Sequence, residues 1–272
     1  MIQGAKIGCG ITTYRRLEQL SRLCQSLPME VIDALVIVND DPDTPLPERL
    51  GRAHVIHNTQ NLGVGKSKNK AMRWLLQQGV EHVFMLEDDV FIKDPEVFAR
   101  YVQASALSGI QHFKYGPVAA LNTCLCGAGA PSLRMGLGKG EGLDFYPAPR
   151  GAFSYFSRYC IETVGLYDEQ YYNAFEHIDH TLRIIQHGLH PPFGFFADIA
   201  DSQHYIGTDT WSEQQSIIGQ MENHSEATAG ADSYFSDKHG LSQGSLLGAG
   251  LAEVLQAILA IQQRFGRVHS VG

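Results

Sequence analysis

The chain has 272 residues, of which 44% are hydrophobic and 18% charged, and its formal net charge is −8. This composition is typical of a globular protein with one large domain or two small ones, and the acidic balance argues against non-specific nucleic-acid binding as the main activity. The five cysteines are odd in number and widely spaced, so they indicate a reducing compartment and favour neither a disulfide framework nor a zinc site. The first residues run directly into a strand, without room for a signal peptide, and no apolar run has the length of a membrane span. We therefore expect a cytoplasmic protein.

Strands and helices alternate along the first half of the chain. The predicted strands cover residues 6–11, 34–38, 53–57 and 82–86, and the predicted helices cover 17–27, 65–78 and 95–108. Polar residues follow several of these strands directly. The order predicts an α/β sheet with polar side chains gathered at the carboxyl ends of its strands.

The acidic run Glu87-Asp88-Asp89 directly follows the apolar strand at 82–86. Ionised carboxylates this close repel each other, and they are costly to desolvate without a cation or a hydrogen-bond donor. A hard divalent metal prefers carboxylate oxygens and leaves positions open for phosphate oxygens. The run therefore predicts a metal site, and the alternative is an acidic turn before the helix that Asp94-Pro95-Glu96 would begin.

Two glycine motifs lack a residue that their chemistry requires. Gly63-Val64-Gly65-Lys66-Ser67 resembles the end of a phosphate-binding P-loop, but Gln60 stands where the first glycine is needed. Gly8-Cys9-Gly10 resembles the opening of a dinucleotide fingerprint, but Thr13 replaces its third glycine. Neither motif predicts its ligand here.

The second half of the chain is less regular. Glycines punctuate residues 127–142, which show little apolar periodicity and which we interpret as a long mobile loop. A strand over 151–156 and a helix over 178–187 follow. Residues 244–265 have the pattern of an amphipathic helix that would cover the sheet, pair with a partner or touch a membrane. Its polar face is poor in Lys and Arg, so membrane contact is the least favoured of the three.

Four segments in the right order resemble the nucleotide-sugar-dependent glycosyltransferases of the GT-A fold, most closely the large inverting family two. The segments are Ile11–Arg16, Val36–Asp41, Asn61–Ala71 and Glu87–Asp89. The resemblance covers about residues 5–207 and implies an α/β fold of GT-A type, with a Rossmann-like nucleotide-binding sheet. It divides the chain into a nucleotide-sugar-binding half (1–122), a glycine-rich mobile loop (123–150), an acceptor-side half with a mixed sheet (151–243) and a C-terminal amphipathic helix (244–272).

The resemblance also implies a donor site at the edge of this sheet. A helix N-terminus near 61–71 would approach the donor, which is a suitable place for an anion. The alternatives are that Asp40 only begins the proline-rich turn and that the lysines of 66–70 form a solvated helix face. The expected donor-binding residues are Thr12, Thr13, Tyr14, Arg16, Asp40, Asn61, Gly63, Lys68, Asn69, Glu87 and Asp88.

Asp89 would be the direct ligand of Mn²⁺ or Mg²⁺, because it is the last carboxylate of the segment that resembles the family's metal motif. His204 stands where many GT-A enzymes supply a late histidine to the metal. The chain has twelve histidines, and the alternative for His204 is a surface or hydrogen-bonding role.

The segment Glu176-His177-Ile178-Asp179, with Arg183 four residues further on, resembles the acidic acceptor-side motif of the family. One acid of that motif is the catalytic base, which takes the proton of the acceptor hydroxyl. The second acid is His177 here, so Glu176 and Asp179 are both candidates for the base. Glu176 is slightly favoured, because Asp179 has the alternative of pairing with Arg183 along the helix. Arg134 and Lys139 of the glycine-rich loop would close over the diphosphate.

Together these features predict a metal-dependent glycosyltransferase that uses a nucleoside-diphosphate sugar, with UDP-sugars the first choice, and that inverts the anomeric carbon. The expected acceptor is a carbohydrate or glycoconjugate. A modified nucleic-acid base ranks second, since Lys66, Lys68, Lys70 and Arg73 would provide a local basic track. A sugar-phosphate nucleotidyltransferase is disfavoured, because the first strand lacks its glycine-rich loop. His177 keeps open a non-catalytic binding protein, and the C-terminal helix offers a surface for a homodimer.

Overall fold

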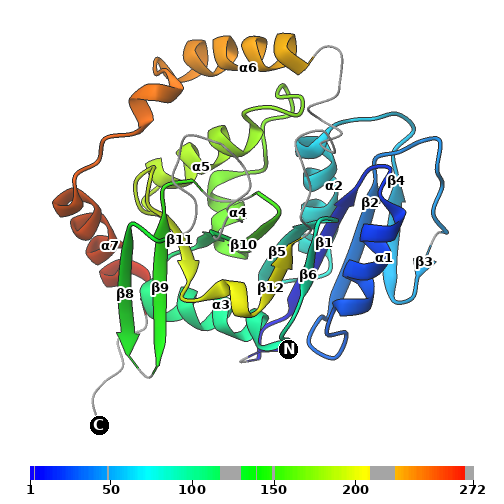
Figure 1. Cartoon of the computed structure of the whole chain (residues 1–272), viewed down its shortest axis with the longest axis horizontal. Coiled ribbons are helices and arrows are strands. Elements are labelled where there is room, and N and C mark those ends of the chain that lie inside the picture. The colour runs from blue at the N-terminus through cyan, green and yellow to red at the C-terminus, as the bar shows by residue number, and fades with distance from the viewer. Residues whose placement is uncertain are drawn as a thin grey trace.

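The computed structural model describes residues 1–2, 4–47, 49–116, 130–138, 140–148, 151–208 and 224–266. A seven-stranded sheet lies at its centre (Figure 1). The strands are β1 (Ile7–Thr13), β2 (Ala34–Asn39), β3 (Arg49–Leu50), β4 (Ala53–His57), β5 (His82–Glu87), β7 (His112–Lys114) and β10 (Phe153–Ser157). Their order is β3-β4-β2-β1-β5-β10-β7. β1, β2, β4 and β5 are parallel, whereas β3, β10 and β7 run antiparallel to their neighbours.

Helices cover both faces of this sheet. The helices of the described residues are α1 (Leu17–Ser26), α2 (Val64–Gln77), α3 (Glu96–Ser108), α4 (Arg158–Val164), α5 (Glu176–Gln186), α6 (His224–His239) and α7 (Leu251–Phe265), and all of them except α6 share a buried cluster with strands of this sheet. Residues of α1, α3 and α7 share one buried apolar cluster, and residues of α2, α4 and α5 share another. Successive residues of a central strand alternate between the two, as Ile37 and Val38 of β2 do. This is the layered α/β arrangement that the sequence predicted.

Two glycines of β1 allow α2 to pack closely on the sheet. A Cβ atom at Gly8 would lie 2.9 Å from Leu75 Cδ2, and one at Gly10 would lie 3.0 Å from Ala71 Cβ. Both contacted residues belong to α2. The pair that resembles the opening of a dinucleotide fingerprint therefore serves helix–strand packing.

Residues 133–146, predicted as part of a mobile loop, form a hairpin, so the loop prediction was wrong for them. β8 (Leu133–Gly138) pairs antiparallel with β9 (Glu141–Tyr146), and β9 pairs with β11 (Phe196–Ile199). Arg134 donates hydrogen bonds of 2.6 and 2.8 Å to the Asp144 carboxylate. Its guanidinium is thus held within the hairpin, and closure over a diphosphate is not supported. Gly127 and Lys139 lie outside the described residues.

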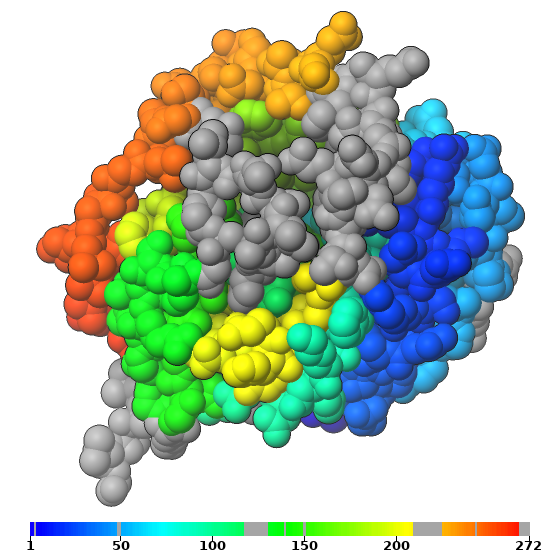
Figure 2. Space-filling model, viewed as in Figure 1, coloured from blue at the N-terminus to red at the C-terminus, as the bar shows by residue number. Residues whose placement is uncertain are grey.

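The C-terminal elements run along the periphery of the molecule, from orange α6 to red α7 (Figures 1 and 2). The sequence predicted a single helix over 244–265, but a 3₁₀ turn at Gln243–Leu246 precedes α7, which begins only at Leu251. Gly248, between them, has a φ of 139°, a conformation that other residues rarely adopt. Within the described part of the chain, no helix combines the length and apolar character needed to cross a membrane.

Candidate active site

The parallel strands β1, β2 and β5 end level with one another. The register pairs Thr13 with Asn39 and Thr12 with Glu87, so the last residues of three neighbouring strands lie side by side. The acidic run at 87–89 and the polar turn at 39–41 therefore share one edge of the sheet. Ligands of open α/β sheets bind at this edge.

Asp88 joins the first strand to the acidic run. Its carboxylate accepts a hydrogen bond of 2.8 Å from Thr13 Oγ1 and one of 3.3 Å from the Arg16 guanidinium. Burial raises the pKa of Asp88 to about 7, and the neighbouring Asp89 and Glu87 carboxylates raise it further. The Thr13 hydrogen bond and the Arg16 charge act in the opposite direction and lower the pKa. The structure thus brings together three residues predicted for the donor site, in a place that favours additional positive charge.

Lys68 is buried against the same acidic run. Its ammonium donates a hydrogen bond of 2.6 Å to Glu87 Oε1 and lies 3.5 Å from the Gly151 carbonyl oxygen. Burial disfavours the charged form, but the Glu87 carboxylate outweighs it and the pKa of Lys68 is raised. Lys68 is therefore an internal partner of Glu87, and the alternative of a solvated helix face does not apply to it.

Asp40 has a structural role in this arrangement. Its carboxylate accepts hydrogen bonds from Asn58 Nδ2 at 2.7 Å, from the Leu62 amide at 2.8 Å and from the Gly63 amide at 2.9 Å. Burial raises the pKa of Asp40 although these donors oppose the rise. Because its oxygens are used to order residues 58–63, the geometry does not support the predicted contact to base or ribose.

The neighbouring Asp41 is the better candidate at the end of β2. It is buried, and its Oδ2 atom accepts no hydrogen bond from the described residues. Its Oδ1 atom lies 3.6 Å from the guanidinium of Arg15, which in turn lies over the Tyr14 ring at 5.0 Å. Sequence reasoning chose Asp40, since only the partners at residues 58–63 distinguish the two acids.

The N-terminus of α2 is already capped by the protein. The Val64 amide donates a hydrogen bond of 2.9 Å to Asn173 Oδ1, and the Gly63 amide contacts Asn61 Oδ1 at 3.0 Å as well as Asp40. Gly63 has a φ of 83°, and a Cβ atom there would lie 2.9 Å from the same Asn173 oxygen. Two amides at the start of the helix, those of Gly63 and Val64, are thus occupied, so these two amides do not support the predicted anion site.

Asn69 also differs from its predicted role. It is fully buried and exchanges hydrogen bonds with the backbone of Tyr167, accepting one of 2.9 Å and donating one of 2.9 Å, while a third of 3.0 Å goes to Glu169. Its amide therefore fastens α2 to the segment at 167–169, and its predicted contact with a donor is not supported.

Three of the four cations in the basic track predicted for a nucleic-acid acceptor have acceptors within the chain, and two of these acceptors are carboxylates. Besides Lys68, Lys70 donates to Asn58 Oδ1, and Arg73 donates a hydrogen bond of 2.8 Å to Glu169. These cations already have acceptors within the chain, so the track gives little support to nucleic-acid binding.

Asp179 is fully buried among cations. Its oxygens accept hydrogen bonds from Arg183 Nε at 2.9 Å, Lys238 Nζ at 2.6 Å and His239 Nε2 at 2.8 Å. Burial alone would raise its pKa, but Lys238, His239 and Arg183 outweigh burial and lower the pKa. Asp179 therefore pairs with Arg183, as the alternative prediction held, and it does not fit the role of a catalytic base.

Glu176 begins α5 and lies against the N-terminal turn of α2. A Cβ atom at Gly65 would lie 3.3 Å from Glu176 Cβ, so the acid packs against the first turn of α2. Its Oε1 atom lies 3.3 Å from His177 Nδ1, and its buried Oε2 atom accepts no hydrogen bond from the described residues. Burial opposes ionisation, but His177 and Lys68 outweigh it and lower the pKa of Glu176 to about 2.

His204 lies away from the acidic run. β6 (Val90–Ile92), which directly follows Asp89, pairs antiparallel with β12 (Ile206–Thr208), so that Thr208 faces Val90. His204 precedes β12 and is exposed, so it lies at the opposite end of this ladder from Asp89. In the parts of the chain that the structure describes, no three His, Cys, Asp or Glu side chains are grouped to hold a metal ion. The predicted pairing of His204 with Asp89 therefore has no geometric support.

The acidic run nevertheless suits a hard divalent cation. Asp89 is 6% exposed and is next to Asp88, whose raised pKa reflects burial and the neighbouring negative charges. Carboxylate donors fit Mn²⁺ or Mg²⁺, and such ions commonly take their remaining ligands from water and from substrate phosphates.

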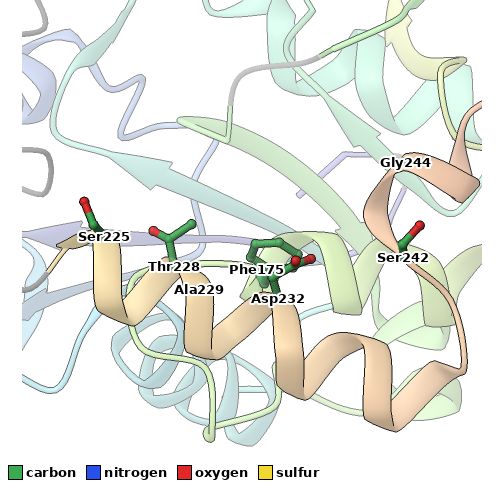
Figure 3. A pocket seen from close by; sticks show the side chains of 7 residues that line it. All are labelled: Phe175, Ser225, Thr228, Ala229, Asp232, Ser242 and Gly244. Carbon is green, nitrogen blue, oxygen red and sulfur yellow. The ribbon is translucent and has the colours of Figure 1, made fainter.

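A polar groove of about 660 Å³ lies between α6 and the start of α5. Figure 3 shows Ser225, Thr228 and Asp232 on successive turns of α6, and Ser242 beyond its end. Phe175 contributes an aromatic ring and directly precedes Glu176. Hydroxyl, carboxylate and aromatic groups are the kinds that hold a polyhydroxylated ligand.

Comparison with known proteins gives matches in structure alone. No protein-family model and no curated protein matches the sequence. A structure of residues 1–349 of S. aureus TarS is 12% identical, with a TM-score of 0.50 and coverage of 98% of this chain and 75% of that chain. A longer structure of S. aureus TarS is 14% identical, with a TM-score of 0.51 and coverage of 98% and 46%.

A mannosyltransferase from Pyrobaculum calidifontis, PcManGT, in complex with GDP-Man and Mn²⁺, is 11% identical, with a TM-score of 0.41 and coverage of 61% of this chain and 48% of that chain. The chain thus spans about half the length of PcManGT and of the longer TarS chain. The likeness to TarS extends over nearly the whole chain and concerns the fold. The protein therefore has the GT-A-type α/β fold that its four sequence segments predicted.

Proposed function

We propose that the protein is a glycosyltransferase that moves a sugar from a nucleoside-diphosphate sugar to a hydroxyl group of a carbohydrate or glycoconjugate, with inversion of the anomeric carbon. The observation that carries the proposal is the acidic run at 87–89 on the ligand-binding edge of a GT-A-type sheet. Asp88 accepts hydrogen bonds there from Thr13 and Arg16, so the acidic run is connected to the end of β1.

The donor would lie across the ends of β1, β2 and β5. The buried Oδ2 atom of Asp41, which accepts no hydrogen bond from the described residues, suits the ring N–H of uracil or guanine. Arg15 links Tyr14 to this acid, since its guanidinium lies 5.0 Å from the centre of the Tyr14 ring and 3.6 Å from Asp41 Oδ1. UDP-sugars are the first donors to test.

The leaving group is a nucleoside diphosphate, and its departure develops negative charge. A divalent cation, when bound, supplies Lewis-acid stabilisation of that charge. Asp89 would hold the cation, and Glu87 and Asp88 would act through water or the ribose. Lys68 holds the Glu87 carboxylate in place through their hydrogen bond of 2.6 Å.

A carbohydrate acceptor is supported over a nucleic acid. The groove beside Phe175 carries hydroxyl groups and the Asp232 carboxylate, and an acid in an acceptor site repels a phosphate backbone. The formal net charge of −8 acts in the same direction.

The test is release of free nucleoside diphosphate from a panel of nucleotide sugars with Mn²⁺, with and without a chelator. We expect slow, chelator-sensitive hydrolysis of one donor. Substitution Asp89→Asn should lower the rate by about 10²-fold or more, since it removes a charge that contacts the developing transition state through the metal. Asp237→Asn, which removes an exposed acid on α6, should leave the rate unchanged.

The same panel of nucleotide sugars distinguishes a metal-dependent enzyme from a metal-independent one and from a binding protein without catalysis. Donor binding by calorimetry without cleavage, even with mixed oligosaccharide acceptors present, would identify a nucleotide-sugar-binding protein that lacks catalysis. Cleavage that survives both chelation and Asp89→Asn would contradict the metal assignment. Absence of both binding and cleavage for every donor would overturn the proposed function.

A further inference from the structure

The acceptor-side motif of this chain contains an unusual pair, a buried glutamate followed by an exposed histidine. Glu176 is only 7% exposed, whereas 48% of the His177 side chain is exposed. Glu176 Oε1 and His177 Nδ1 lie 3.3 Å apart. A carboxylate next to Nδ1 favours the tautomer with the proton on that nitrogen, so the lone pair of the imidazole is on Nε2.

The backbone that carries this pair is firmly held. Thr181 Oγ1 donates a hydrogen bond of 2.7 Å to the His177 carbonyl oxygen, and it accepts one of 2.8 Å from the buried Lys114. Phe175, directly before the pair, has a φ of 65°, in the left-handed region that non-glycine residues seldom occupy. Such backbone is found preferentially at functional sites, because surrounding structure must hold it in place.

Glu176 is poorly suited to take a proton itself. Both the imidazole of His177 and the ammonium of Lys68 stabilise its charged form against burial, and its pKa falls to about 2. A general base works best when its pKa lies near the working pH. The carboxylate is also buried, while the imidazole beside it reaches solvent.

We propose that His177 is the general base of the transfer reaction and that Glu176 is a positioning residue that holds the imidazole. This rests on the proposed function, since it assigns roles within the same reaction. An oxygen of the acceptor hydroxyl forms a bond to the anomeric carbon, and the bond from that carbon to the β-phosphate oxygen breaks with its electron pair on the phosphate. The acceptor proton passes to His177 Nε2, and the resulting imidazolium is stabilised by the Glu176 carboxylate.

The decisive comparison is His177→Asp against His177→Asn. The two replacements have nearly the same shape, but only aspartate accepts a proton at neutral pH. With the donor that the wild-type protein hydrolyses, we expect His177→Asn to lower kcat by about 10²–10⁴-fold with little change in KM. His177→Asp should retain a rate within about tenfold of wild type, because it restores a base. Similar rates for His177→Asn and wild type would overturn the role of His177.

Azide provides a readout that a structural role would not change. It is an anionic nucleophile that needs no deprotonation, so sodium azide should restore nucleoside-diphosphate release by His177→Asn and yield a glycosyl azide detectable by mass spectrometry. Failure of azide to restore release, in a variant that still binds the donor as wild type does, would count against loss of a base as the cause.

The role of Glu176 can be measured without turnover. Nitrogen-15 spectra should show His177 of the wild-type protein as the Nδ1-protonated tautomer, and Glu176→Gln should shift that equilibrium and lower kcat. An Nε2-protonated His177 in the wild-type protein would overturn the pair. Failure of the wild-type protein to cleave any donor would overturn the proposed function and this role with it, whereas cleavage that survives His177→Asn overturns the role alone.

Discussion

Asp198, in β11, is a fully buried acid surrounded by donors. Its oxygens accept hydrogen bonds from the Tyr101 hydroxyl, from the Gly116 and Ile199 amides at 2.8 Å, and from Ser202 Oγ at 2.5 Å. Burial outweighs these donors and raises the pKa of Asp198 to about 7. A carboxyl group with a raised pKa in the folded protein makes stability depend on pH in a direction opposite to the usual one.

The direction in which the unfolding free energy changes with pH follows from proton binding. The unfolded acid titrates near pH 4 and the folded one near pH 7, so the folded state holds an extra proton between these values. The stabilisation from Asp198 is thus complete below about pH 4 and is lost as the pH rises through 7, by roughly 4 kcal/mol at most. We expect the unfolding free energy of wild type, relative to that of Asp198→Asn, to fall between pH 4 and 7 in urea titrations.

Other acids act in the opposite direction, which is why the difference between the two proteins is the quantity to measure. The pKa values of Asp179 and Glu176 are lowered in the fold, so their stabilisation is lost as the pH falls through the acid range. Asp237→Asn, an exposed substitution, should follow wild type at every pH. A constant difference between wild type and Asp198→Asn across the range would contradict the raised pKa.

At the scale of single residues, the sequence could place acids at the sheet edge but not assign their partners. The carboxyl ends of adjacent parallel strands must meet, so the run at 87–89 and the turn at 39–41 were predictable. Whether a polar side chain is bound within the protein or open to a ligand depends on groups far along the chain. Asp179 binds Lys238, for example, and Asn69 binds Tyr167. His177 was visible as a departure from the motif, but its contact with Glu176 was not.

Among the helices, α6 is attached to the rest of the protein mainly through its C-terminal end. Lys238 donates hydrogen bonds of 2.6 Å to both Asp168 and Asp179, His239 donates to Asp179 at 2.8 Å, and Phe235 is fully buried beside them. The rest of the helix is largely exposed. The docking of α6 therefore depends on a few charged and aromatic groups.

Removing the charge at Asp179 should release this helix. Asp179→Asn removes the only carboxylate that Arg183 contacts among the described residues, while Lys238 keeps Asp168 as a partner. Breaking a buried ion pair typically costs about 3–5 kcal/mol. We expect a corresponding loss of unfolding free energy in urea, together with faster hydrogen exchange across residues 224–239. Asp237→Asn, on the same helix but exposed, should change neither quantity. Unchanged exchange in Asp179→Asn would show that the Asp179 charge is not needed and that the contacts to Asp168 and the apolar contacts are enough to hold α6.

Helices and strands were predicted well from the sequence where their apolar periodicity is strong. The strand at 53–57 and the helix near 64–77 were predicted nearly to the residue, because apolar periodicity and a terminal glycine mark them. The hairpin β8–β9 was missed, since its glycines hide the alternation and its pairing depends on β11, about fifty residues away. α6 was missed because only Ala231 and Phe235 on it are buried apolar residues.

On the scale of the whole molecule, α7 leaves part of its apolar surface uncovered. Val254, Ile258 and Ile261 are buried in the core cluster that α3 shares. Three leucines follow one another at helical spacing on the adjoining side, and a fourth precedes the helix. Their exposed fractions are 53% for Leu251, 37% for Leu255, 52% for Leu259 and 63% for Leu247. A contiguous apolar stripe of this kind often marks a contact with another protein surface.

We predict that this stripe forms a homodimer interface with a dissociation constant in the micromolar range, because a few leucines per copy must also offset the entropy of association. Each copy carries a formal net charge of −8, so the two copies repel and added salt should strengthen the dimer by screening. Analytical ultracentrifugation should show Leu255→Glu as a monomer at concentrations where wild type dimerises. Ala260→Glu places the same charge on the opposite side of α7 and should still dimerise. Wild-type monomers at every concentration and salt would contradict the predicted dimer interface.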